Sequence, residues 1–289
     1  MAWDGMERRR NPVPLDGAWP NPPRLPGGLR VAARLTAALV WTFLCALVQA
    51  VCIVLPGRAK IVVPRLYWAG ICRCLSLRVR VIGAPMASRG LPVVFVSNHS
   101  SWMDIPALGA ILPACFIAKG EVGQWPIIAM VARLGRTLFV SRRAATAARE
   151  AADILHRLKE RDNLVLFPEG TTSDGTRILP FRSSLLAVAE AGVPLALQPV
   201  TIVYDEMDSL PVRREDRALF AWFGDMNLAS HFNRVARCHH LRVTVQLHPP
   251  IDPRTAGGRK RITQRIGAEV AGSAAELRRN REAKRPAGA

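Results

Sequence analysis

The feature that most constrains this chain is an apolar run without a charge, from Leu35 to Leu55. Its 21 residues would extend ~31 Å as a helix, close to the thickness of the hydrocarbon core of a bilayer. It is the only run that is both apolar and long enough to cross a membrane, which excludes a multi-spanning transporter. The run begins late and ends in Leu55-Pro56-Gly57 without a small-x-small site, unlike a cleaved signal peptide.

A second segment, Ile61 to Leu77, is apolar but interrupted by a proline and two arginines. It carries Tyr67 and Trp68, aromatic residues that favour the headgroup level of a membrane. The pattern is typical of an interfacial amphipathic helix. Both ends of the Leu35–Leu55 run are basic, so the positive-inside rule gives no orientation. A spanning helix and a shallow helical hairpin are both left open.

The charge balance indicates an anionic partner. Lys and Arg number 40 against 22 Asp and Glu, a net charge of +18. Arginines gather on both sides of the apolar run, where anionic headgroups attract each by about 1 kcal/mol. Nucleic acid is not an expected partner, because the basic C-terminal segment lacks aromatic residues. The six cysteines lie mostly in apolar sequence and show no zinc-like ligand spacing, so we expect reduced thiols facing the cytoplasm and no metal.

The chain divides into four segments by composition. We expect a disordered, proline-rich lead-in over residues 1–29, membrane-anchoring helices over 30–77, a globular domain over 78–257 and a basic tail over 258–289. Strands alternate with helices in the globular part, which predicts an α/β domain with a mostly parallel sheet flanked by helices. The expected strands are Val79–Ile82, Pro92–Val96, Cys115–Ala118, Thr137–Val140, Leu164–Phe167, Leu195–Val203 and Leu241–Leu247, and the expected helices are Ile127–Leu134, Ala144–Arg161 and Ser183–Ala191.

The first polar block, Asn98 to Asp104, follows the expected strand Pro92–Val96. Function in α/β folds usually lies at the carboxyl end of a strand. If a helix begins at Ser100 or Ser101, Asp104 lies one turn in and can reach back to the imidazole of His99. A carboxylate on Nδ1–H fixes the tautomer and leaves Nε2 free as a base. The alternative is a capped helix with a structural histidine.

The second polar block is Phe167 to Ser173, where a buried strand delivers a carboxylate, a glycine and three hydroxyls. Backbone N–H groups and hydroxyls in such a turn could hold a polar headgroup, although an ordinary strand–turn fits equally well. Between the two blocks, Gly135–Arg142 puts cations at a strand end. After them, Val193–Val200 is an apolar strand bracketed by prolines, which mostly indicates core.

In this order, the four blocks resemble those of the lysophospholipid acyltransferase family, the 1-acyl-glycerol-3-phosphate acyltransferases and their relatives. The resemblance covers roughly Pro92 to Val203. It implies that His99 is the general base and Asp104 its orienting partner. The substrate-binding residues that it implies are Lys119, Arg142, Glu169, Gly170, Thr171, Thr172 and Arg182.

One departure from the family pattern concerns the acceptor lipid. Many members continue Glu-Gly-Thr with an arginine that is expected to touch the acceptor phosphate, and here that position is Thr172. Arg177 and Arg182 are the neighbouring cations that could take its place. The run from Ser173 to Arg182 is also similar to the bacterial branch that includes lyso-ornithine-lipid acyltransferases. We expect 1-acyl-sn-glycerol-3-phosphate as acceptor, with lyso-ornithine lipid as the alternative.

The resemblance thus implies a membrane-bound O-acyltransferase. Its acyl donor would be acyl-CoA or acyl carrier protein, its acceptor the free hydroxyl of a lysolipid, with no further cofactor and no metal. Backbone N–H groups near the helix start after His99 would stabilise the oxyanion. The expected location is the cytoplasmic (inner) membrane, with the catalytic domain facing the cytoplasm. The rival of another class is a non-catalytic basic membrane scaffold or nucleic-acid binder, for which His99 and Glu169 would be dispensable.

Overall fold

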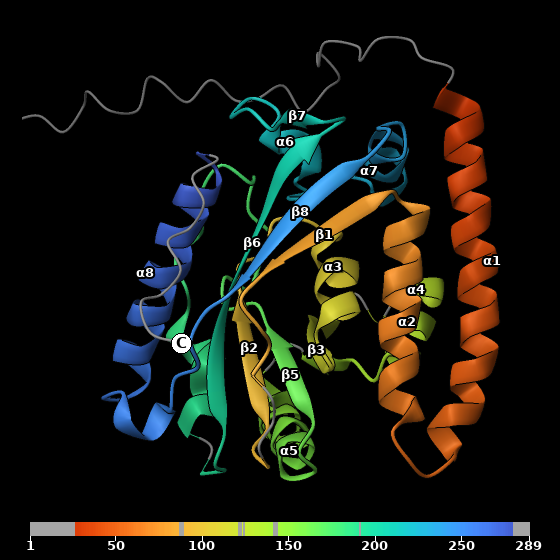
Figure 1. Ribbon diagram of the computed structural model, residues 1–289. Coiled ribbons are helices and arrows are strands. Elements are labelled where there is room, and N and C mark those ends of the chain that lie inside the picture. The colour runs from red at the N-terminus through yellow and green to blue at the C-terminus, as the bar shows by residue number, and fades with distance from the viewer. Residues whose placement is uncertain are drawn as a thin grey trace, which may run out of the picture.

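The computed structural model describes residues 27–86, 90–120, 123, 125–140, 144–190 and 192–279. These residues form one eight-stranded sheet in the order β1-β8-β6-β2-β5-β3-β4, with β7 paired to β6 alone (Figure 1). The strands are β1 (Leu77–Ile82), β2 (Val93–Ser97), β3 (Ala114–Lys119), β4 (Leu138–Val140), β5 (Asn163–Leu166), β6 (Ala196–Met207), β7 (Leu210–Pro211) and β8 (Leu241–Leu247).

Strand direction follows the predicted mostly parallel pattern, and among the described strands β7 and β8 pair antiparallel with β6. The five strands β6, β2, β5, β3 and β4 are all parallel, which confirms the mostly parallel sheet flanked by helices. The strands β1 and β8 are parallel to each other, but β8 runs antiparallel to β6. All five residues of β2 are buried, as expected for a parallel strand that is covered on both faces.

Helices cover the two faces of the sheet. The helices α2 (Ala59–Cys74), α3 (Asp104–Ile111) and α7 (Leu228–Val235) share one apolar core with the sheet, and α5 (Ala144–Lys159), the 3₁₀ helix η2 (Ser183–Glu190) and α8 (Arg259–Leu277) share another. The remaining helical elements are α1 (Gly27–Val54), α4 (Pro126–Leu134), α6 (Arg217–Phe220) and the short η3 (Pro253–Thr255). The two cores hold the carboxyl ends of β2 and β5 side by side.

The helices α1 and α2 form an outer layer at one side of the sheet, beyond α3 (Figure 1). Pro64 lies inside α2 and lacks an N–H, so the carbonyl of Lys60 loses its helical partner. The side-chain amide of Gln49 on α1 donates to that carbonyl at 3.1 Å. The two helices are therefore joined at the point where α2 is weakest.

The side chains of Tyr67 and Trp68 pack partly inside the protein. Both pack against the core that α2 shares with α3, and a methyl group placed on Gly109 would come within 2.3 Å of the Trp68 ring. Both rings are only half-buried, so this packing leaves part of each available, and their location at the headgroup level stays a prediction.

The segment expected as a basic tail also differs. Most of it, Arg259 to Leu277, forms α8, which packs on the sheet through buried Ile262, Ile266 and Val270. These three apolar residues recur four positions apart, a spacing that keeps them on one helix face, but the surrounding arginines conceal the pattern in the overall composition. Residues 1–26, most of the expected lead-in, lie outside the described residues.

Candidate active site

The loop after β2 is fixed to β6 by the side chain of Asn98. Its amide donates to the carbonyl of Ile202 at 2.9 Å and accepts from the N–H of the same residue at 2.9 Å. This pair of bonds ties the loop to a central strand, so the following residues have a defined position at the carboxyl end of the sheet.

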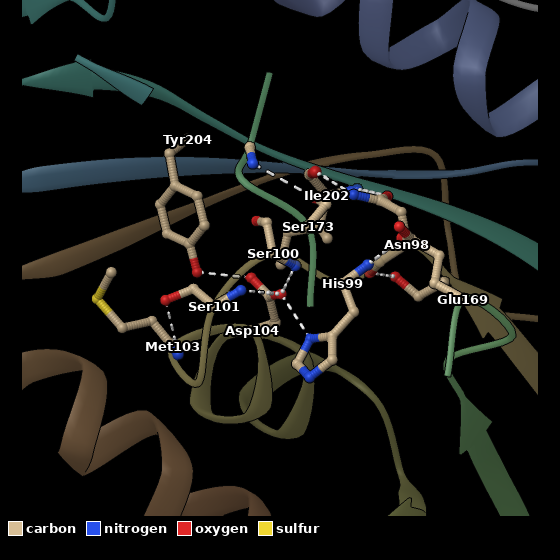
Figure 2. A network of polar contacts seen from close by, with 12 residues as sticks. Asn98, His99, Ser100, Ser101, Met103, Asp104, Glu169, Ser173, Ile202 and Tyr204 are labelled. Atoms are coloured by element: carbon tan, nitrogen blue, oxygen red, sulfur yellow. Dashed lines mark hydrogen bonds and ion pairs between the residues drawn. The ribbon is translucent and has the colours of Figure 1, made fainter. Parts of the chain in front are cut away.

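His99 and Asp104 meet in this loop, as their spacing predicts. The Nδ1 atom of His99 lies 2.8 Å from Oδ2 of Asp104, which also accepts from the N–H groups of Ser100 and Ser101 at 2.8 and 2.9 Å (Figure 2). The hydroxyl of Tyr204 on β6 donates to Oδ1 at 2.7 Å. The carboxylate is fully buried, and this set of donors satisfies it in the ionised form.

The imidazole of His99 is held in one orientation. Because the carboxylate of Asp104 is an acceptor, Nδ1 carries the proton and the neutral ring has its lone pair on Nε2. The ring stacks on Phe167 with centroids 4.1 Å apart and planes 17° apart. The side chain is 18% exposed, and Nε2 points away from Asp104 (Figure 2). A partly accessible, oriented lone pair can accept a proton from a bound hydroxyl.

Glu169 connects the loop after β5 to the loop that carries His99. Its Oε1 accepts from the backbone N–H of His99 at 2.7 Å, and its Oε2 accepts from the N–H of Leu179 at 2.8 Å. The N–H of Ser173 donates back to the carbonyl of His99 at 2.9 Å. Burial raises the pKa of Glu169 to about 7, against the opposing effect of its two backbone donors. This carboxyl therefore positions both loops.

Two of the N–H groups near the helix start, expected as oxyanion donors, bind Asp104 instead. The N–H groups of Ser100 and Ser101 are the first after His99, and both donate to Asp104. They are therefore not available to a tetrahedral intermediate. The turn that precedes α3 uses these donors to hold the orienting carboxylate instead.

The other expected substrate-binding residues differ in backbone conformation and exposure. Gly170 has a φ of 68°, which lets the chain turn directly after Glu169. Thr171, Lys119 and Arg182 are exposed and Thr172 is half-buried. Within the described ranges, the side chains of these four residues make no hydrogen bond or ion pair. Arg142 lies outside the described residues.

Two residues of this network were not expected from the sequence, Asn98 as a loop anchor and Tyr204 as a donor to Asp104. Tyr204 lies beyond the expected end of its strand, because β6 continues to Met207. The sequence indicates this role of Tyr204 only weakly. A tyrosine at a buried strand position needs a partner for its hydroxyl, but nothing in the sequence identifies that partner.

Comparison with known proteins matches residues 78–203 to a family described as Acyltransferase. A lyso-ornithine lipid O-acyltransferase of Brucella abortus is 37% identical over 72% of this chain and 79% of its own length. A protein of the same name from Pseudomonas aeruginosa is 39% identical over 65% of this chain and 69% of its own.

More distant matches carry another name. A 1-acyl-sn-glycerol-3-phosphate acyltransferase of Neisseria meningitidis is 28% identical over 61% of this chain and 66% of its own length. The crystal structure of the 1-acyl-sn-glycerophosphate acyltransferase PlsC from Thermotoga maritima aligns with a TM-score of 0.65 at 22% identity, covering 89% of this chain and 97% of that one. At this identity the likeness shows the fold.

Proposed function

Because the chain belongs to the lysophospholipid acyltransferase family and is an O-acyltransferase, we propose that it acylates the free hydroxyl of a lyso-ornithine lipid with His99 as the general base. The observation that carries the chemistry is the oriented imidazole, with Nδ1 on a buried carboxylate and Nε2 free of described partners. A thioester is already activated, so the hydroxyl needs only a positioned base.

The reaction follows from this geometry in two steps. The hydroxyl of the acceptor gives its proton to Nε2 of His99 while its oxygen attacks the thioester carbonyl. Collapse of the tetrahedral intermediate breaks the carbon–sulfur bond, and the departing sulfur takes the proton from the imidazolium. Asp104 stabilises the imidazolium between the two steps without accepting its proton. The donor is acyl-CoA or acyl carrier protein, whose negative charge suits a chain with a net charge of +18.

The acceptor is proposed from the relatives and from Thr172. Relatives named lyso-ornithine lipid O-acyltransferase are 34–39% identical, and those named 1-acyl-sn-glycerol-3-phosphate acyltransferase from Neisseria are 28–29% identical. This moves the proposal away from 1-acyl-sn-glycerol-3-phosphate, which the sequence analysis favoured. A fixed arginine at position 172 would repel the ammonium group of an ornithine headgroup, whereas the threonine there does not.

The acceptor is tested by offering both lysolipids to the purified chain, each with labelled acyl-CoA and with acyl carrier protein. We expect a higher kcat/KM for lyso-ornithine lipid, and Thr172→Arg should shift the ratio toward 1-acyl-sn-glycerol-3-phosphate. Ser184→Arg, which adds the same charge at an exposed position of η2, should leave the ratio unchanged. A ratio that responds equally to both substitutions would contradict a headgroup role for Thr172.

The proposal includes attachment to one leaflet of the cytoplasmic membrane, with the catalytic domain facing the cytoplasm. The helix α1 is the one described helix long and apolar enough to span a bilayer. Near its start Arg34 donates to the carbonyls of Ala236, Cys238 and His239, and further on Gln49 donates to the carbonyl of Leu134. The contacts of Arg34 and that of Gln49 lie about 22 Å apart along α1. If α1 spanned the membrane, α4 and the end of α7 would have to enter the hydrocarbon layer with it.

The outward side of α1 is the proposed lipid contact, since Leu39, Phe43 and Leu47 are each more than half exposed. The triple variant Leu39→Glu, Phe43→Glu, Leu47→Glu should lose most flotation with phosphatidylglycerol–phosphatidylethanolamine vesicles. The matched control adds the same charges on exposed positions of α5: Ala148→Glu, Ala151→Glu, Ala152→Glu.

Sidedness is tested with sealed inside-out vesicles that carry the chain with a tag before Gly27. Attachment to one leaflet predicts that added protease digests the tag together with the domain. Protection of the tag would show that α1 spans the membrane.

A further inference from the structure

A small pocket with two arginines lies behind the loop that carries Asp104. Its lining includes Ser100 and Tyr204 from the polar network, Gly175 from the loop after Glu169, Arg217 at the start of α6 and Arg278 just after α8. The backbone of Gly175 has a φ of 76°, and a methyl group there would come within 3.2 Å of the carbonyl of Arg217. The loop after Glu169 therefore passes close to the start of α6, and a side chain at position 175 would crowd the backbone of Arg217.

The two guanidinium groups are attached to the protein through backbone carbonyls only. Arg278 donates to the carbonyl of Thr176 at 3.2 Å, and Arg217 donates to the carbonyl of Arg278 at 3.4 Å. Among the residues that the structure describes, no carboxylate oxygen lies within 4 Å of either guanidinium. Both side chains are only partly exposed, so water compensates their charge incompletely.

The carboxylates nearest to Arg278 are already engaged. Asp174 accepts from the N–H and the hydroxyl of Thr176 at 2.9 and 2.8 Å. Glu169 accepts from two backbone N–H groups of the catalytic loops. Burial and the nearby charge of Arg217 lower the pKa of Arg278 to about 10, and these two carboxylates oppose that shift only in part. The pocket thus has an excess of positive charge.

Partly buried cations without a partner are costly, and guanidinium groups match the forked geometry of phosphate and carboxylate oxygens. We infer that Arg217 and Arg278 form a binding site for a single oxyanion, a phosphate or carboxylate group, beside the catalytic network. The site shares Ser100 and Tyr204 with that network, whose carboxylate orients His99. This inference goes beyond the proposed function, because it depends neither on the acceptor nor on the reaction.

The test uses the full chain in detergent with inorganic phosphate as the probe. At constant ionic strength set with sodium chloride, phosphate should raise the melting temperature of the wild type along a saturable curve. Arg278→Gln and, separately, Arg217→Gln should weaken the apparent phosphate affinity about tenfold or more, because each removes a charged hydrogen-bond donor. Arg279→Gln changes the exposed neighbouring arginine and should leave the curve unchanged.

The source of the oxyanion is distinguished by two matched pairs of ligands. CoA is compared with 3′-dephospho-CoA, and lyso-ornithine lipid with the corresponding putrescine amide, which lacks the carboxylate. A stronger shift with one member of a pair, lost in Arg278→Gln, assigns the site to that group and supports the inference. Equal shifts within both pairs, with phosphate still binding, assign it to free phosphate and support it too.

Two results would overturn the inference. One is a wild type whose melting temperature does not respond to phosphate along a saturable curve. The other is a response that survives unchanged in either Arg217→Gln or Arg278→Gln, provided that the variant melts cooperatively. If one variant fails to fold, the other alone decides.

Discussion

The loops after β2 and β5 each contribute a buried carboxyl, and the two are held in opposite ways. Asp104 accepts four hydrogen bonds, from His99, two backbone N–H groups and Tyr204. Glu169 accepts from two backbone N–H groups only, and burial raises its pKa to about 7. The first carboxyl binds an imidazole and has donors on both of its oxygens, and the second joins two loops. Burial alone therefore does not tell which of the two carboxyls orients the catalytic base.

The largest expected effect comes from removing the imidazole of His99, which only the loop after β2 carries. His99→Ala should lower kcat about 10²–10⁴-fold, the usual worth of a general base, and the fold should be kept because the ring is partly exposed. Asp104→Asn should cost less, since the base survives in a poorer orientation. Activity is measured with saturating thioester, and folding by circular dichroism. A folded His99→Ala chain with nearly normal turnover would favour the non-catalytic scaffold.

A finer test removes one of the four donors to Asp104. Tyr204→Phe leaves Oδ1 without its hydroxyl partner, which should cost about 1–3 kcal/mol of stability and lower kcat more than it changes the KM for either substrate. Tyr67→Phe is the matched control, because its hydroxyl lies 3.2 Å from that of Thr42, away from Asp104. Equal kinetic effects from the two substitutions would show that the hydroxyl of Tyr204 does not support the base.

The last expected effect is on stability alone and concerns its pH dependence through Glu169. A carboxyl whose pKa is raised in the folded state contributes stability that is present below its ordinary pKa and is lost as the pH rises through about 7. Relative to Glu169→Gln, the wild type should therefore lose up to roughly 3 kcal/mol between pH 4.5 and pH 8. Urea unfolding at several pH values measures this difference, and the exposed Glu276→Gln should show none of it. Parallel pH curves for wild type and Glu169→Gln would contradict the raised pKa.

The sequence predicted the parts of the fold and site that depend on local pattern. The parallel strands are continuous apolar runs, and β8 was expected over its observed range, Leu241–Leu247. The contact between His99 and Asp104 follows from one turn of chain before α3. Such features need only neighbours in sequence, and periodicity or spacing therefore identifies them.

The features that the sequence did not predict depend on contacts between distant segments. Tyr204 reaches Asp104 only because β6 lies beside β2 and extends past its end. Arg278 enters a pocket with Gly175 because α8 folds back across the sheet. The antiparallel pairing of β8 with β6 has no local signature either. The mostly parallel sheet and its flanking helices could be predicted from the sequence pattern. The residues that support Asp104 or line the arginine pocket could not, because their partners lie far away in the sequence.

The pairing of β1 with β8 has a consequence for the order of synthesis. The helices α1 and α2 are made before the sheet and lead directly into β1, yet the partner of β1 and the carbonyls that hold Arg34 belong to residues 236–247. At cellular translation rates about 160 further residues take roughly 8–30 s to make. During that interval the leading helices are available to lipid while the sheet lacks an edge, so arrested nascent chains that stop before Leu241 should be cleaved readily by protease beyond Leu77.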